Sequence, residues 1–243
     1  MVINLATGVG DLAASQPALI PILDSLGIDF CCGGQRSLAD AARAAGQDPD
    51  SVLRALAAGR PEGADEPAVD WRQADLSTLV DHIVSRHHDY LRQALPRISD
   101  LMITVLRAHG ENHPELAAVS RQFQALRNEL SDHLLKEERV LFPLIQSMAA
   151  TRSLDGNHCG SVTNPIGVME FEHDNAGEAL RNLRVWTGGY TPPADACPTY
   201  RALLRDLADL ERDLHEHIHK ENNILHPRAV ALEASLLNAA AGR

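Results

Sequence analysis

The chain has 243 residues, which is enough for one large domain or two smaller ones. Its 33 acidic residues outnumber its 22 basic residues and give a formal net charge of −11. A surface of this sign repels phosphate backbones and anionic lipids, so the charge argues against nucleic acid and membranes as partners. Aromatic residues make up only 4%, which argues against a large β-sandwich and against stacking surfaces for single-stranded nucleic acid.

The lack of a recognisable targeting signal and the spacing of the cysteines lead us to expect a cytoplasmic protein. No apolar run approaches the roughly 18 residues that a membrane helix needs. The first basic residue is Arg36, so the basic start of a secretory leader is missing. Four cysteines form neither a CxxC pair nor a regular disulfide framework. We therefore expect a reducing, cytoplasmic environment.

The first 60 or so residues are predicted to form short helical pieces. One piece is expected to begin at Pro17, with proline at its start, and to end at Gly27. Ser37 is a candidate N-cap for a second piece, and Asp48 or Asp50 for a third. Together these pieces predict a small helical domain over residues 1–62.

A GxGxxA pattern covers residues 8–13 and needs separate consideration. A dinucleotide site would require a strand before it and a βαβ unit around it. Pro17 follows closely, and no second strand is predicted before the linker. We therefore interpret the pattern as a loop and the start of a helix.

Residues 60–70 have the composition of a linker, and the chain beyond them is predicted to be long-helical. Four long helices joined by short loops most often form an up-down-up-down bundle. The predicted fold class is therefore all-α, with a bundle domain over residues 71–240. The expected helices cover about 75–108, 115–148, 166–186 and 199–237.

An internal repeat carries the chemistry of the bundle. HLLKEERVLFP (133–143) aligns with HIHKENNILHP (217–227) at five identical positions out of eleven, and both lysines of the protein fall at the same place. A His-Asp pair precedes each copy, His88-Asp89 by 45 residues and His173-Asp174 by 44 residues. These spacings indicate a two-fold repeat of a helical hairpin.

The repeat predicts a metal site in the core of the bundle. Residues equidistant from the turn of a hairpin lie at equal height, and a glutamate at i+4 shares the face of its histidine. Six side chains are too many for one tetrahedral zinc, and mixed imidazole and carboxylate donors suit two iron, manganese or zinc ions. The predicted ligands are His88, His133, Glu137, His173, His217 and Glu221.

The remaining polar residues receive weaker predictions. Glu129 and Glu172 are candidates to accept a hydrogen bond from the ring nitrogen of a ligating histidine that does not bind the metal. His215 and His219 are expected to face solvent, since they lie about 200° around the helix from His217. His226 replaces Phe142 of the other copy, and its role stays open. The other histidines, at positions 82, 87, 109, 113 and 158, are interpreted as structural, and Cys159 and Cys197 receive no role.

The sequence resembles a known family. The pattern H…HxxxE…H…HxxxE is similar to the hemerythrin-like domain. The segment GIDFCCGG (27–34) resembles the amino-terminal domain of the repair-of-iron-centres family of ScdA, YtfE, DnrN and NorA type. LFPLI, VMEFEHDNAG and KENNILHPRA are also similar to segments of that family. The resemblance covers nearly the whole chain.

The resemblance implies a cytoplasmic, non-haem di-iron protein of the nitrosative and oxidative stress response. Two iron ions would be bridged by Glu137 and Glu221, with nitric oxide or oxygen as small ligands and damaged iron–sulfur proteins as clients. The expected function is cluster repair by iron donation. Reversible carriage of nitric oxide or oxygen and reduction of nitric oxide remain as alternatives, as does a homodimer.

Cys31 and Cys32 belong to the same family signature. Adjacent cysteines rarely form a disulfide, because the small ring strains the trans peptide. One interpretation is a reactive thiol pair that binds metal, reacts with nitric oxide or passes electrons. The other is a buried pair beside a glycine turn. The first interpretation expects the amino-terminal domain to place these thiols near the bundle.

Overall fold

A computed structural model describes residues 3–59, 69–154 and 159–241. Regular structure in these ranges is helical, and the one isolated β-bridge described joins Gly8 and Ser37. The all-α prediction is therefore confirmed. Residues 8–13 contain a helix start and no preceding strand is described, so the dinucleotide interpretation is excluded.

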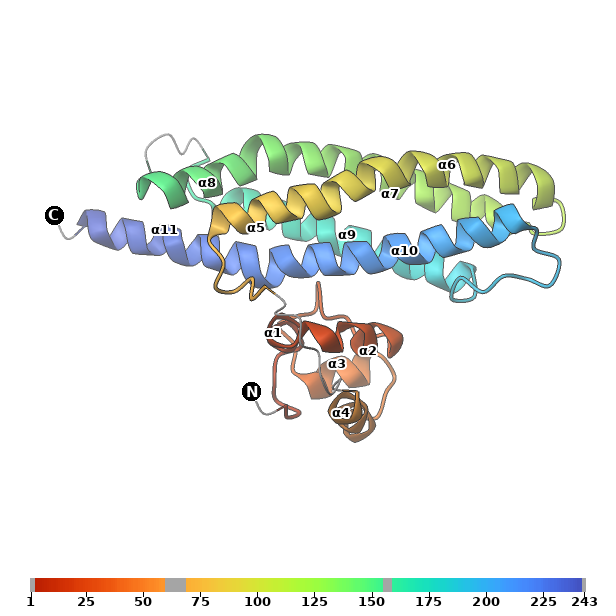
Figure 1. Cartoon of the computed structure of the whole chain (residues 1–243), viewed down its shortest axis with the longest axis horizontal. Coiled ribbons are helices and arrows are strands. Elements are labelled where there is room, and N and C mark those ends of the chain that lie inside the picture. Colours follow the sequence, from red (N-terminus) through yellow and green to blue (C-terminus); the bar gives the residue numbers. More distant parts are fainter. Residues whose placement is uncertain (1–2, 60–68, 155–158, 242–243) are drawn as a thin grey trace. The chain divides into compact units, whose positions relative to one another are not determined.

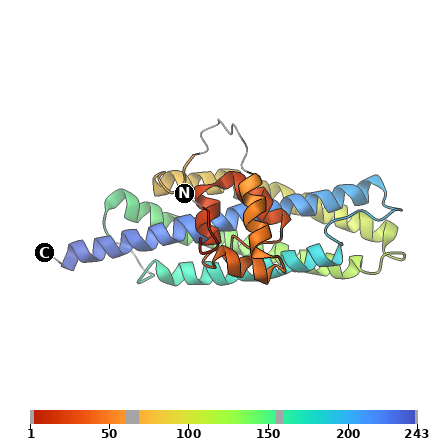
Figure 2. The same cartoon turned by 90° about the horizontal axis from the view of Figure 1, so that it is seen from below.

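The chain forms two compact units, and the second holds most of the helical bundle. It comprises Asp81–Leu144 and Thr163–Leu214. Its long helices are α6 (Asp89–His109), α7 (Leu116–Lys136), α9 (Thr163–Trp186) and the first part of α10 (Pro198–Lys220). Figures 1 and 2 show these helices side by side, with short connections from α6 to α7 and from α9 to α10. Each connection joins neighbouring helices at one end, as the up-down-up-down prediction requires.

Apolar stripes hold the bundle helices together. On α6, Leu91, Leu95, Ile98, Met102 and Val105 are buried at helical spacing. Burying such side chains contributes about 1.5–3 kcal/mol each. Buried acids on α10 add specific pairings with cations on other helices. These pairs are Asp206 with Arg97, Glu211 with Arg184, and Asp213 with both Arg86 and His87.

Among the described residues, three π-helical segments interrupt the long helices. Val84–His88 separates α5 (Leu76–Ile83) from α6, and Glu137–Leu141 separates α7 from α8 (Phe142–Thr151). Glu221–Leu225 separates α10 from α11 (His226–Ala241). The last two segments occupy the same place in the two copies of the repeat. Such turns insert a residue into the helix and often lie at functional sites.

The first unit contains the short amino-terminal helices, and their caps explain where they begin. It comprises Met1–Val80, Ile145–Val162 and His215–Arg243. The Ser37 side chain accepts a hydrogen bond from the Asp40 N–H, and Asp48 accepts one from the Ser51 N–H, so both predicted N-caps are confirmed. The helices are α1 (Val9–Ser15), α2 (Ile20–Ser25), α3 (Leu38–Ala44) and α4 (Pro49–Ala58).

Asn223 ties the amino-terminal loop to the π-helical segment Glu221–Leu225. Its side-chain amide donates to the carbonyl oxygens of Phe30 and Cys31, each at 3.1 Å. A Cβ on Gly10 or Gly34 would overlap the Asn223 side chain. Glycine at these two positions therefore lets the backbone approach the helix closely.

The expectation that His215 and His219 face solvent is wrong. His219 is buried, and His215 is half-buried and bonds Asp24 at 2.8 Å. The Phe30 ring packs edge-on against both imidazoles. Burial lowers the His219 pKa to about 4, which keeps that imidazole neutral. The amino-terminal residues of the same unit cover this face of α10, which helical periodicity alone does not reveal.

Contacts of α11 complete the first unit. Arg228 donates to the carbonyl oxygens of Trp71 and Ala74. Glu233 accepts hydrogen bonds from the Val162 N–H at 2.8 Å and the Ser161 hydroxyl at 2.6 Å. These bonds attach α11 to the segments that precede α5 and α9.

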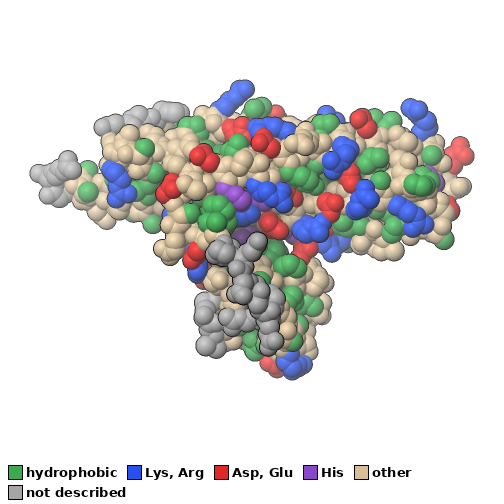
Figure 3. Space-filling view, in the orientation of Figure 1, with side chains coloured by type: hydrophobic (Ala, Val, Ile, Leu, Met, Phe, Trp, Pro, Cys, Tyr) green, Lys and Arg blue, Asp and Glu red, His purple; other side chains and the backbone are tan. Residues whose placement is uncertain are grey.

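Charged side chains of both signs lie on the surface of the molecule. On the face shown in Figure 3, basic and acidic side chains are interspersed among the coloured residues, without the continuous basic tract typical of nucleic-acid binding. None of the described helices combines the length and apolar character needed to cross a bilayer.

We predict that Gly34→Ala destabilises the protein by about 1–3 kcal/mol, because the added methyl group displaces Asn223. Gly167→Ala is the matched control, since a Cβ on this α9 residue meets no atom within 4 Å. Urea unfolding of both variants measures the difference. Equal midpoints for wild type and Gly34→Ala would contradict the close approach.

Candidate metal centre

The six predicted metal ligands are all buried, with exposed fractions of 4% or less. Two of them begin π-helical segments, namely Glu137 and Glu221, and His88 ends the third. The remaining three histidines lie within α7, α9 and α10. The full set is His88, His133, Glu137, His173, His217 and Glu221.

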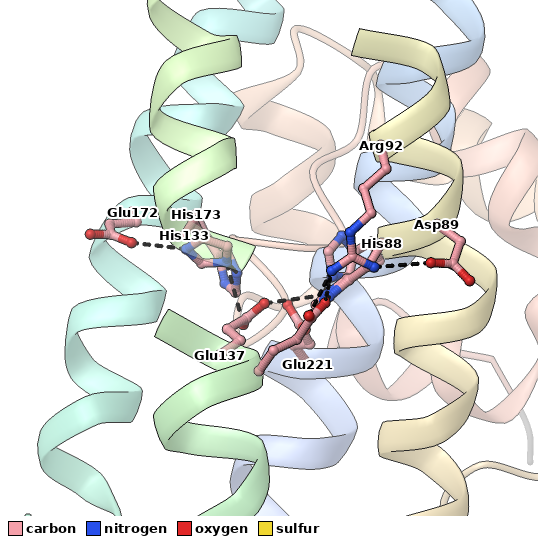
Figure 4. A network of polar contacts seen from close by, with 10 residues as sticks. His88, Asp89, Arg92, His133, Glu137, Glu172, His173 and Glu221 are labelled. Atoms are coloured by element: carbon pink, nitrogen blue, oxygen red, sulfur yellow. Dashed lines mark hydrogen bonds and ion pairs between the residues drawn. The ribbon is translucent and has the colours of Figure 1, made fainter. Parts of the chain in front are cut away.

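The ligand atoms of these six residues gather into two overlapping groups of four. Within each group, one nitrogen or oxygen atom per residue lies within 4.8 Å of the others. Both groups contain the two glutamates, and Figure 4 shows Glu137 and Glu221 next to the histidines. The first group is His88, Glu137, His217 and Glu221, and the second is His133, Glu137, His173 and Glu221.

Glu137 directs its two carboxylate oxygens to two different histidines. Its Oε2 lies 3.3 Å from the Nε2 atom of His88, and its Oε1 lies 3.3 Å from the Nε2 atom of His133. His133 Nε2 also lies 3.1 Å from the Nε2 atom of His173. On the other repeat copy, His217 Nε2 lies 3.1 Å from Glu221 Oε1. The carboxylate of Glu137 is thus placed to connect two donor groups.

Glu138 contacts the Nδ1 atom of His88 and was not among the residues predicted from the sequence. Its Oε1 lies 2.6 Å from His88 Nδ1, and its Oε2 lies 2.6 Å from Arg92. Burial raises the Glu138 pKa, but hydrogen bonds from His88 and Arg92 outweigh it and lower that pKa below its usual value. An ionised carboxylate only accepts hydrogen bonds, so His88 donates through Nδ1 and keeps Nε2 for the interior.

Glu172 contacts the Nδ1 atom of His133 in the same way. Its Oε2 lies 2.9 Å from His133 Nδ1, and its other oxygen pairs with Lys136. Burial again raises the Glu172 pKa, while Lys136 and His133 outweigh this effect and lower it. Of the two carboxylates predicted from their position near a histidine, Glu172 contacts the ring of His133, whereas Glu129 lies exposed on the surface of α7.

The donor set fits a pair of cations such as iron. Two carboxylates at zero exposure would be costly to bury in their ionised form without a compensating charge. Imidazole nitrogens and carboxylate oxygens suit iron, manganese and zinc, and two shared carboxylates allow two ions to share one site. Histidines whose Nδ1 is engaged by a carboxylate are typical of metal centres.

The cysteine pair forms a small polar group with Asp29. Cys31 is buried, Cys32 is half-buried, and their sulfur atoms lie 3.8 Å apart and are not joined in a disulfide. Asp29 accepts hydrogen bonds from the Cys31 thiol at 3.4 Å and the Cys32 N–H at 2.9 Å. The hydrogen bond with Cys32, together with burial and the charge of Asp29, raises the Cys31 pKa. Cys31 is therefore a protonated thiol at neutral pH.

The remaining histidines lie outside the two donor groups. His226 begins α11 and is buried, while its counterpart Phe142 stacks on His88 at 5.6 Å. His87 is buried against Asp213, in agreement with a structural role. His158 falls outside the described residues.

Comparison with known proteins matches both parts of the chain. Residues 79–229 match the hemerythrin HHE cation-binding domain. Residues 5–59 match the ScdA amino-terminal domain, which is described as a domain of unknown function.

Full-length relatives cover nearly the whole chain. The iron–sulfur cluster repair protein YtfE of Escherichia coli O81 (strain ED1a) is 38% identical over 226 residues, or 93% of this chain and 97% of the relative. The protein of the same name from Escherichia fergusonii is 37% identical with the same coverage. The chain therefore belongs to the hemerythrin-type iron–sulfur cluster repair family, with a ScdA-type amino-terminal domain ahead of its cation-binding domain.

Proposed function

We propose that the protein holds two iron ions and donates iron to damaged iron–sulfur proteins in the cytoplasm. The observation that carries this proposal is the pair of overlapping donor groups that share two buried glutamates. The relatives are named iron–sulfur cluster repair proteins, which supports the same conclusion. Damaged iron–sulfur proteins are then the clients.

The ligand chemistry favours iron that is held but exchangeable. Imidazole and carboxylate donors accept both ferrous and ferric iron, and the metal supplies redox chemistry when it is bound. The protein's own part is to orient the histidines, through Glu138 on His88 and Glu172 on His133. Arg92 and Lys136 neutralise these outer carboxylates at the edge of the site.

The cysteine pair is proposed to act with the metal centre in the response to nitrosative and oxidative stress. Asn223 donates to the Cys31 carbonyl oxygen, and it lies two residues from Glu221. This bond places the cysteine loop beside the helix segment that carries a proposed bridging ligand. Nitric oxide and oxygen are the small ligands that we assign to the centre.

We predict that Glu137→Gln and Glu221→Gln lower iron content, because each removes a negative donor shared by both groups. Elemental analysis should find about two irons per wild-type chain and clearly less in each variant. Glu129→Gln is the matched control, since Glu129 is exposed on α7, and it should keep the wild-type iron content. Unchanged iron in both buried variants would contradict the bridging assignment.

Removing the supporting carboxylates tests the orientation of the histidines. Glu138→Gln and Glu172→Gln should each weaken iron binding by about 10–100-fold, because the histidine loses its anionic partner. Competition with a chromophoric chelator measures this loss. Iron affinity equal to wild type in both variants would show that the outer carboxylates are not needed.

The role of the thiols is tested in the Cys31→Ala/Cys32→Ala double variant. We expect its iron content to match wild type, while recovery of a client enzyme with a nitric-oxide-damaged cluster falls. Cys159→Ala serves as the control cysteine variant. Full repair by the double variant would leave the pair with a packing role only.

Two alternative activities give different outcomes in the same assays. A carrier of nitric oxide or oxygen would form a stable adduct without transferring iron to the client. A nitric oxide reductase would release nitrous oxide when a reductant is supplied. Iron that moves to the client, counted by elemental analysis after separation, supports donation.

A further inference from the structure

A second cluster of metal-binding side chains lies within the bundle unit, in the connections that follow α6 and precede α10. His109 ends α6, His113 lies in the turn before α7, and Asp195 belongs to the connection before α10. One ligand atom from each of these residues lies within 4.8 Å of the others. They are not part of either buried donor group. We call these three residues and Cys197 the loop cluster.

The orientation of His113 is that of a metal ligand. Its Nδ1 lies 3.0 Å from Glu115 Oε1, and its Nε2 lies 3.1 Å from both carboxylate oxygens of Asp195. Glu115 therefore occupies the position that a supporting carboxylate takes behind a ligating histidine. The same arrangement holds His88 and His133 in the buried centre.

Cys197 is the candidate fourth donor beside this group, although its sulfur is not among the ligand atoms that all lie within 4.8 Å of one another. The His109 ring lies within hydrogen-bonding reach of the Cys197 sulfur. That sulfur also accepts a hydrogen bond from the Tyr200 N–H at 3.5 Å. Cys197 thus lies immediately before α10 with its sulfur atom near His109.

The two imidazoles are also held by packing. The Tyr200 ring is buried, and its centroid lies 5.3 Å from that of His109 and 5.6 Å from that of His113. Rings fixed on one side lose little freedom when they bind an ion on the other side. Asp195 is exposed and both histidines are half-buried, so an ion has a path to the cluster.

We propose that the loop cluster binds one zinc ion. The two imidazole nitrogens and the carboxylate oxygen lie close enough to share one ion, and movement of the Cys197 sulfur toward them would complete a four-donor set suited to tetrahedral zinc. The carboxylate and the thiolate together balance the charge of a divalent ion. The sulfur donor distinguishes this cluster from the buried centre, whose donors are nitrogen and oxygen only. Bound zinc would join the α6–α7 connection to the α9–α10 connection.

The test uses the full-length, iron-loaded protein and zinc chloride as the probe. After equilibrium with zinc and gel filtration, elemental analysis should find one zinc per chain in addition to the unchanged iron. His113→Ala and Cys197→Ala should each lower the zinc affinity at least tenfold. Cys159→Ala is the matched control and should bind zinc like wild type.

A second readout identifies the sulfur ligand directly. Cobalt(II) bound in place of zinc should give a thiolate-to-cobalt charge-transfer band, and this band should be absent in Cys197→Ala. Asp195→Asn changes only an exposed side chain, so it keeps the test valid where His113→Ala fails to fold. Iron content and circular dichroism report folding in every variant.

Three results would overturn the proposal. The first is that the iron-loaded protein takes up no zinc. The second is that His113→Ala and Asp195→Asn bind zinc as tightly as wild type. The third is that zinc enters only by displacing iron. The last result would assign zinc uptake to the buried centre. The proposal does not depend on iron donation, because its readouts are zinc content and a cobalt spectrum.

Discussion

Two carboxylates at zero exposure, Glu137 and Glu221, set the main constraint on this fold. Burying an ionised carboxylate costs several kcal/mol unless an opposite charge compensates for it. Histidines that bind a metal do so as neutral imidazoles, so in a metal site the histidines around these carboxylates would not cancel their charge. Two cations held at the shared donor groups, as proposed above, would supply that compensation and would link metal binding to the stability of the bundle interior.

The organisation around this constraint is layered. Glu138 and Glu172 fix the outer nitrogens of His88 and His133, and Arg92 and Lys136 in turn hold these carboxylates near the surface. Opposite charges meet in the outermost contacts, where Arg92 pairs with Glu138 and Lys136 pairs with Glu172. The inner nitrogens of the two histidines are left oriented toward Glu137, in a geometry set by the bundle helices.

The two copies of the repeat have diverged where their surroundings differ. The first copy follows its inner glutamate with Glu138 and Arg139, and Glu138 supports His88. The second copy has Asn222 and Asn223 at these positions, and Asn223 binds the loop that carries the cysteine pair. One copy thus supports a ligand, while the other anchors the amino-terminal residues beside the same kind of turn.

The sequence predicts the parts of this arrangement that depend on local spacing. Periodicity and caps predict the long helices and the starts of α3 and α4, and the HxxxE repeat selects the residues that the structure gathers into two groups. The π-helical segments, Glu138 and the burial of His219 depend on contacts with residues distant in the chain. Helical phase alone placed His219 in solvent, because it carries no information about the Phe30 loop.

The most direct test of this account is anomalous diffraction at the iron edge from crystals of the iron-loaded protein. Two peaks are expected, one beside His88 and His217 and one beside His133 and His173, with Glu137 and Glu221 reaching both. A single peak that contacts only one group, or iron bound away from the six residues, would contradict the shared-carboxylate centre.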